Sequence, residues 1–209
     1  MQHWRTFLAG ILILVTSLSA AEYVPQEGDL LFQSLPHNEV IDAIEGSTAS
    51  PYSHCGIVVS TLLGWSVLEA IGPVKQTPLK QWTAQGRERT FAVFRLREEH
   101  RPHIPAMIAA ARKYSGLPYD IQYELDDKKI YCSELIYKAW LTATGQRMGK
   151  LVKLGDLDWK PHEQVIRAIA DGLPLERLMI TPRDLAQAPQ LEAVLPLGAH
   201  PILTPKKKR

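Results

Sequence analysis

The sequence predicts an α+β fold in a single domain, with antiparallel strands and separate helices. Two runs of strand length, His54–Val59 and Ser66–Ala70, flank a turn signal at Gly64, as in a β-hairpin. Apolar residues over 132–143 recur at helical spacing and predict a helix with one buried face. No repeat or low-complexity linker divides the 209 residues, so one hydrophobic core is expected.

The first half of the domain reads as short strands joined by turns. In chain order we expect a strand at Leu30–Gln33, a helical turn at Asn38–Ile44, the hairpin, a capped turn at Thr77–Trp82 and a strand at Thr90–Leu96. Pro78 is expected at the first helical position of the capped turn, where its missing N–H costs nothing.

The second half is predicted to be mainly helical. The expected helices are Pro102–Ser115, a helix that starts near Cys132 and ends at Gly145, and His162–Ala170. A strand end at Met179 then leads into a turn, with Thr181 as its N-cap and Pro182 behind it.

The two ends of the chain have their own signals. Residues 1–21 carry Arg5, an apolar run at Phe7–Val15 and small residues before position 22, which is the pattern of a secretory signal peptide. We therefore expect export to the periplasm or the cell exterior, with an uncleaved signal anchor as the alternative. The domain is expected over 22–200, and 201–209 is a basic tail that is either solvated or in weak contact with a membrane surface.

Composition narrows the classes of partner. The net charge of +2 is too small to indicate a nucleic-acid partner, and the apolar fraction of 45% is ordinary for a globular domain. The chain has only two cysteines, Cys55 and Cys132, so it is not a disulfide scaffold.

Cys132 is the candidate nucleophile. The segment 116–120 before it is rich in helix breakers, so Cys132 falls in the first turn of its helix. Free backbone N–H groups and the positive end of the helix dipole favour a thiolate there and can stabilise an oxyanion. The alternative is that Cys132 is one more small apolar residue of the buried stripe.

A cysteine nucleophile needs a base, and the base needs an orienting acceptor. His54 begins a predicted strand, just after a loop whose Ser, Thr, Pro and Gly content suits the rim of a cleft. The hairpin turn would bring Glu69, on the next strand, beside His54. Each residue also has a non-catalytic interpretation: His54 as a hydrogen-bonded structural histidine, and Glu69 as a glutamate that faces solvent. Cys55 follows His54 in the strand and should point to the opposite face, so we interpret it as a core residue.

Four segments in this order resemble the YiiX-like branch of the circularly permuted, NlpC-type, papain-like cysteine hydrolases. They are Ser53–Val59, Val67–Ala70, Gly116–Asp120 and Tyr131–Leu135, and the segment 180–185 also fits. In that branch the histidine strand precedes the cysteine helix. Tyr131 stands where many unpermuted members have Asp.

The resemblance implies an antiparallel sheet packed against helices, with the nucleophile at a helix N-terminus. It implies Cys132 as nucleophile, His54 as general base and acid, and Glu69 as the residue that orients His54. Tyr119 and Tyr131 are implied to line the substrate site or donate to the oxyanion, with core packing as the alternative for at least one of them.

The expected function is therefore a secreted cysteine amidase or peptidase that works through a thioester and requires no metal or organic cofactor. A peptidoglycan-derived peptide is the leading substrate, and a lipid amide or ester, hydrolysed or transferred, is the alternative. Two rivals are a non-catalytic ligand-binding module and a metal protein using His54, Cys55 and Cys132. Strand neighbours on opposite faces make joint ligation by His54 and Cys55 awkward.

Overall fold

A computed structural model describes residues 22–199 and 202–203. Its centre is a six-stranded antiparallel sheet with the strand order β5-β4-β3-β2-β6-β9. The strands are β2 (Leu30–Gln33), β3 (His54–Thr61), β4 (Gly64–Ala70), β5 (Val74–Pro78), β6 (Ala92–Leu96) and β9 (Leu191–Leu195). Two small pairs lie outside this sheet, β1 (Glu22–Tyr23) with β10 (Ile202–Leu203), and β7 (Val152–Lys153) with β8 (Leu178–Met179).

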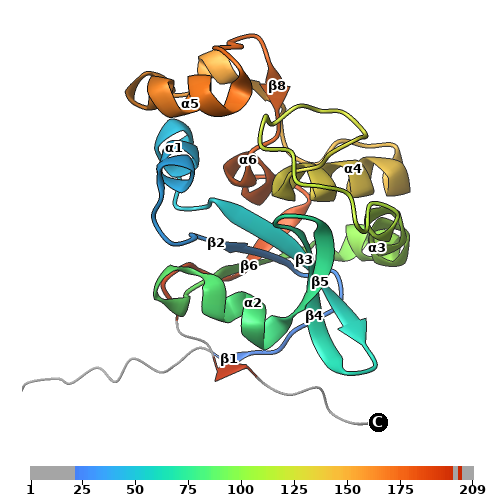
Figure 1. Ribbon diagram of the computed structural model, residues 1–209. Helices are drawn as coiled ribbons and strands as arrows, with labels where there is room; N and C mark the ends of the chain where they lie inside the picture. Colours follow the sequence, from blue (N-terminus) through green and yellow to red (C-terminus); the bar gives the residue numbers. More distant parts are fainter. Residues whose placement is uncertain (1–21, 200–201, 204–209) are drawn as a thin grey trace, which may run out of the picture.

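The helices flank the sheet (Figure 1). The α-helices are α1 (Glu39–Thr48), α2 (Leu79–Gln85), α3 (Ile104–Arg112), α4 (Cys132–Thr144), α5 (Glu163–Ala170) and α6 (Pro182–Ala186). Short 3₁₀ turns are found at η1 (Arg87–Arg89), η2 (Glu98–His103), η3 (Leu154–Asp156) and η4 (Lys160–His162). The predicted α+β class, with an antiparallel sheet packed against helices, is confirmed.

The two faces of the sheet carry separate apolar clusters, because side chains alternate along a strand. Cys55 and Ile57 of β3 face the main core, which α3 and α4 complete. Val58 faces the other side, where Trp82 of α2 packs in a smaller cluster. The start of β3 therefore lies between two environments, and this is where the candidate site is found.

The β3–β4 hairpin forms as predicted. Ile57 pairs with Leu68, and the turn falls between Thr61 and Gly64. Gly56 allows the two strands to pack closely on one face, since a Cβ there would lie only 2.4 Å from a methyl of Val67. The same position would lie 3.3 Å from the Cβ of Glu69, so this glycine also helps to set Glu69.

A small cap is built from η3, η4, α5 and the β7–β8 ribbon. It has its own apolar cluster, formed by Leu154, Ile166 and Ala170. The cap lies beside α1, at the top of the molecule in Figure 1. The close approach of α1 is visible at Gly46, where a Cβ would overlap the ring of His162.

Several predicted boundaries change. Pro78 ends β5 and is the N-cap residue of α2, so its expected place inside the first turn was wrong. The error arises because Val74–Pro78 pairs with β4 as a further strand. A local turn signal does not reveal this pairing. Residues 191–195 were not among the predicted strands; their Leu, Glu and Ala favour a helix, and pairing with β6 decides otherwise.

The predicted signal peptide, residues 1–21, and the tail beyond Leu203 lie outside the described residues. Two residues of the predicted tail, Ile202–Leu203, pair with β1. Within the described ranges, every helix is too short or too polar to cross a lipid bilayer.

Candidate active site

Cys132 is the first residue of α4. The preceding Tyr131 has extended backbone angles, and its N–H donates to Oε2 of Glu134 at 3.2 Å, which fixes the start of the helix. The hydroxyl of Ser133 donates to the carbonyl oxygen of Ile180 at 2.7 Å. The helix end that carries the sulfur is therefore held on two sides.

His54 and Glu69 form a buried pair on adjacent strands. Nε2 of His54 lies 2.6 Å from Oε2 of Glu69, and neither side chain is more than 2% exposed. This contact leaves Nδ1 as the ring nitrogen free to exchange a proton with Cys132. The imidazole ring packs near the indole of Trp82, with 5.8 Å between ring centroids.

Glu69 is held in turn by neighbours that the sequence did not single out. The hydroxyl of Thr77 in β5 donates to Oε1 at 2.5 Å, and Nε2 of Gln85 in α2 lies 3.4 Å from Oε2. Burial by itself would raise the pKa of Glu69, but the hydrogen bonds and charge of His54, with the Thr77 donor, lower it overall.

Cys132 meets His54 at the end of the sheet. The sulfur lies 4.0 Å from the carbonyl oxygen of Ser53, the residue that precedes His54 in the chain. Burial lowers the pKa of His54, but its bonds to Cys132 and Glu69 outweigh this and raise that pKa to about 9. The pKa of Cys132 falls well below that of a free thiol, because the influence of Cys55 and of the His54 imidazole outweighs burial. The shifts are those of a thiolate–imidazolium pair.

Cys55 lies on the face opposite His54, as the alternation predicts, and both cysteines are free and buried. Alternation did not reveal that Cys132 approaches from the side of Cys55. Cys55 and Cys132 therefore belong to the same core cluster.

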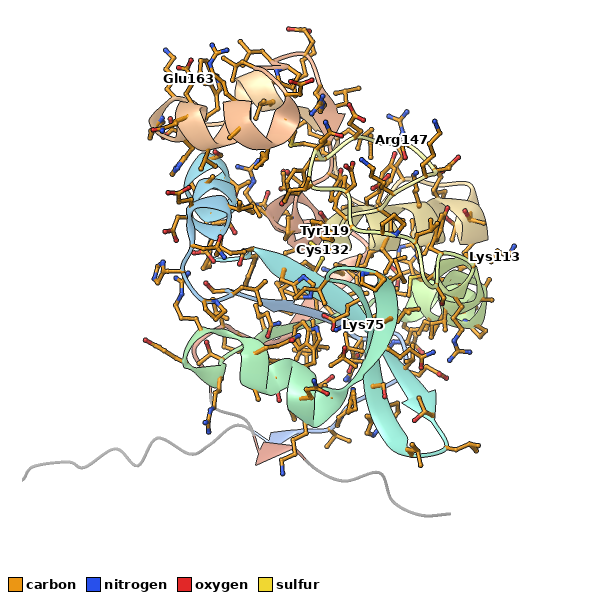
Figure 2. The ribbon with its side chains drawn as sticks, viewed as in Figure 1. Lys75, Lys113, Tyr119, Cys132, Arg147 and Glu163 are labelled. Atoms are coloured by element: carbon orange, nitrogen blue, oxygen red, sulfur yellow. The ribbon has the colours of Figure 1, made fainter. Side chains whose placement is uncertain are left out.

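The two candidate tyrosines are placed differently. Tyr119 is partly buried and lies beside Cys132, as Figure 2 shows, with its hydroxyl 3.5 Å from that of Tyr123. Tyr131 is 1% exposed, and its hydroxyl accepts the N–H of Ile180 at 3.0 Å. Tyr119 lines a cavity at the site, whereas Tyr131 lies outside the walls of both cavities that open there.

Two cavities of different character meet at the site. A narrow one of about 80 Å³ is bounded by α1, the cap and Cys132, and its walls are mostly aliphatic. A wider one of about 640 Å³ contains His54 and Tyr119 together with the polar Asn38 and Glu39. Ser53 and Tyr123 belong to the walls of both.

Residues 24–195 match the family described as "Permuted papain-like amidase enzyme, YaeF/YiiX, C92 family". The chain belongs to this family. It is therefore a papain-like cysteine hydrolase of the amidase type, in which the histidine strand precedes the cysteine helix.

Known relatives agree with this assignment. The chain is 35% identical over 188 residues to the "Uncharacterized protein YiiX" of Escherichia coli K12, covering 88% of this chain and 93% of that protein. A crystal structure of the "metalloprotein yiiX" from Escherichia coli O157:H7 is similar, with a TM-score of 0.75 and 36% identity. That match covers 81% of this chain and 96% of the other.

Sequence reasoning missed Thr77, Gln85 and Tyr123 as neighbours of the site. Thr77 and Gln85 belong to β5 and α2, whose boundaries the local pattern misplaced. The signal that could have indicated Tyr123 is its position between Tyr119 and Tyr131, the two tyrosines already considered for the site.

Proposed function

We propose that this amidase-family protein hydrolyses an amide that carries an apolar acyl chain, through a thioester on Cys132. The observation that carries the proposal is a chain of three buried groups: Nε2 of His54 lies 2.6 Å from Oε2 of Glu69, and Cys132, at the start of α4, lies 4.0 Å from the carbonyl oxygen of Ser53, the residue before His54. Such a chain is the arrangement a nucleophile, its base and an orienting acceptor require, whereas a binding module has no need of all three.

In the proposed reaction the thiolate of Cys132 attacks the carbonyl carbon, and the carbonyl oxygen becomes an oxyanion. The imidazolium of His54 gives its proton to the amide nitrogen, the C–N bond breaks, and the amine leaves. Water then loses a proton to His54 and attacks the thioester, releasing the acid and restoring Cys132. Glu69 keeps its charge and holds the imidazole in place.

Two donors are available for the oxyanion. The backbone N–H of Cys132 belongs to the first turn of α4, where N–H groups lack partners within the helix. The hydroxyl of Tyr119 is the second, since Tyr119 and His54 line the same cavity.

The shape of the site supports an acyl chain on the carbonyl side. The narrow cavity begins at Cys132 and runs between α1 and the cap, past Ala43, Ile166 and Ala170. A methylene chain fills such a slot at a gain of about 0.8 kcal/mol per buried CH₂, whereas a charged peptide would lose its hydration there. The amine side faces the wider cavity, whose polar residues suit a solvated leaving group.

A metal is not part of the proposal. The similar crystal structure from Escherichia coli O157:H7 is described as that of a metalloprotein. Within residues 22–199 and 202–203 of this chain, no three His, Cys, Asp or Glu side chains converge in the way a metal ion requires. We therefore derive no step through a metal.

The test compares wild type with Cys132→Ser on N-acyl amides of increasing chain length and on muropeptides, with products identified by mass spectrometry. We expect cleavage by wild type alone, faster for long acyl chains. Equal product profiles from the two proteins would remove the enzymatic proposal. Cleavage of muropeptides alone would replace the acyl amide by a cell-wall peptide.

The cavity itself is tested by Ala170→Phe, with Ala168→Phe as the matched control. Ala170 is a buried wall residue of the narrow cavity, whereas Ala168 lies exposed on the same helix. We expect Ala170→Phe to lower kcat/KM for long-chain substrates at least tenfold, because the larger side chain displaces about two methylene groups of the acyl chain, each of which contributes about 0.8 kcal/mol. The kcat/KM for acetyl amides should be unchanged. An equal effect of both variants would contradict the acyl assignment.

Export belongs to the proposal as well, because residues 1–21 have the pattern of a signal peptide. Cell fractionation should find the protein in the periplasm or the medium. A salt-sensitive association of the purified protein with anionic vesicles, lost on removing Lys206–Arg209, would support weak surface contact by the tail.

A further inference from the structure

Tyr123 lies in the walls of both cavities, and the proposed reaction gives it no role. The residues that the two walls share are Val40, Ile44, Ser53 and Tyr123. Residues that border two cavities stand where the cavities meet, so this group marks the junction. Tyr123 has the largest side chain of the four.

The ring of Tyr123 packs against two other tyrosines. Its centroid lies 5.1 Å from that of Tyr131, with 59° between the ring planes, and 6.3 Å from that of Tyr119, with 89° between the planes. Its hydroxyl is 3.5 Å from the hydroxyl of Tyr119. Inclined and edge-to-face rings are favoured arrangements, so the ring has a defined place at the junction.

The backbone of Tyr123 is also held in place. Its φ of 57° lies in the left-handed region, which is unfavourable for a bulky residue. The carboxylate of Asp120 accepts the N–H groups of Gln122 and Glu124 at 3.0 and 2.5 Å. Arg177, which precedes β8, donates to the carbonyl oxygen of Gln122 at 2.6 Å and to Oε1 of Glu124 at 3.0 Å. Such a conformation persists only where the surroundings fix it, and here they fix the residues on both sides of Tyr123.

We propose that Tyr123 is the specificity-determining residue of the site, whose ring separates the two cavities and restricts the acyl group to a linear chain. The inference rests on the proposed function, which places the acyl chain in the narrow cavity. It narrows the substrate class to amides of unbranched acyl chains.

The difference in size between the two cavities gives the reason. The narrow cavity has about 80 Å³ and the wider one about 640 Å³. With the ring in place, an acyl group on Cys132 has to follow the narrow cavity, where a bulky group would overpack the walls. Without the ring the two spaces join, and a bulky acyl group can extend into the wider one.

The experiment measures kcat/KM for two amides of the same amine, one decanoyl and one adamantanecarbonyl. The first variant is Tyr123→Gly, because glycine tolerates the positive φ and removes the ring without backbone strain. Tyr123→Asn also removes the ring and tolerates this conformation, so it gives the same test if the glycine variant does not fold. Tyr123→Phe keeps the ring and removes only the hydroxyl.

The matched control is Tyr114→Ala. Tyr114 is another half-buried tyrosine against the main core, and it lies outside the walls of both cavities. Its truncation therefore costs packing and leaves the junction intact. Thermal unfolding of each variant reports the packing loss separately.

We expect the ratio of kcat/KM for decanoyl over adamantanecarbonyl amide to fall about tenfold or more in Tyr123→Gly and Tyr123→Asn, and to stay within about threefold of wild type in Tyr123→Phe and Tyr114→Ala. An unchanged ratio in the ring-deleted variants would overturn the inference. An equal fall in Tyr123→Phe or in Tyr114→Ala would do the same, because the ring would then not be the cause.

A binding measurement separates this inference from the proposed function. Titration calorimetry of decanoic acid and adamantanecarboxylic acid, with Cys132→Ser protein that has Tyr123 or Gly at position 123, requires no turnover. A changed affinity ratio without cleavage of any amide would support the separation of the cavities and refute the hydrolase. Cleavage with neither ratio changed would refute the role of Tyr123 and leave the hydrolase standing, and absence of both cleavage and binding would overturn both.

Discussion

Two buried glutamates border the site, and their environments differ. The side chains of Glu69 and Glu134 are both fully buried, yet the pKa of Glu69 is lowered while burial raises that of Glu134 to about 7. Glu69 has His54, Thr77 and Gln85 around it. Glu134 has Lys138 at 2.9 Å and the N–H of Tyr131.

The comparison shows that burial alone does not set the charge of an acid. Around Glu69 the charge of His54 and the Thr77 hydroxyl outweigh desolvation, so the carboxylate is available to hold the imidazolium of His54. Around Glu134 desolvation wins and raises the pKa to about 7, at the start of the helix that carries Cys132. In the proposed function Glu69 holds the imidazole of His54, whereas Glu134 accepts the N–H of Tyr131 at the helix start.

The largest predicted contrast is in activity. Glu69→Gln keeps the shape and removes the charge that stabilises the imidazolium, so kcat/KM on the acyl amide should fall by about 10²-fold or more. Glu134→Gln, which keeps a cap acceptor, should stay within about tenfold of wild type at pH 8. Similar losses in the two variants would contradict the division of roles.

The second prediction concerns stability against pH, measured by urea unfolding of Glu134→Gln and wild type. The folded pKa of Glu134 is raised from 4.5 to about 7, so its contribution is full below pH 4.5 and is lost as the pH rises through 7. The free energy of unfolding of the variant, relative to that of wild type, should therefore increase by on the order of 3 kcal/mol as the pH rises through this window.

The sign should reverse at the other acid. The lowered pKa of Glu69 gives a contribution that is present above pH 4.5 and lost as the pH falls below it. Glu69→Gln should therefore lose stability relative to wild type as the pH rises. Parallel curves for wild type and either variant would show that the acid keeps its ordinary pKa when folded.

A smaller effect is expected from Thr77→Val, which removes the donor at 2.5 Å from Oε1 of Glu69. An unsatisfied buried carboxylate oxygen should cost about 1–3 kcal/mol of unfolding free energy. Thr77→Ser retains a hydroxyl and is the control; it should recover most of the stability and of the activity. Failure of the serine variant to recover either would assign the effect to lost packing.

The smallest effect is expected from Lys138→Met. Lys138 is 14% exposed and its ammonium lowers the pKa of Glu134, so its loss should raise that pKa by up to about one unit. The pH midpoint at which the stability contribution of Glu134 is lost should move to higher pH, while kcat/KM at pH 6 stays within about threefold of wild type. A downward shift would show that Lys138 does not pair with Glu134 in solution.

Much of the site was predictable because signals close in the sequence place several of its residues. Breakers before Cys132 and periodicity after it place the cysteine at a helix start, and the turn at Gly64 brings Glu69 onto the strand next to His54. Thr77 and Gln85 were missed because they reach Glu69 through a strand and a helix that form only by pairing with β4.

The sequence by itself determined the α+β class, the hairpin, the helix start at Cys132 and the order of histidine before cysteine, because each depends on residues close together in the chain. The tertiary structure alone decided that the cap and α1 border a mostly aliphatic cavity, and that Thr77 and Gln85 reach Glu69. These features arise where distant segments pack, and no local periodicity encodes which faces will meet.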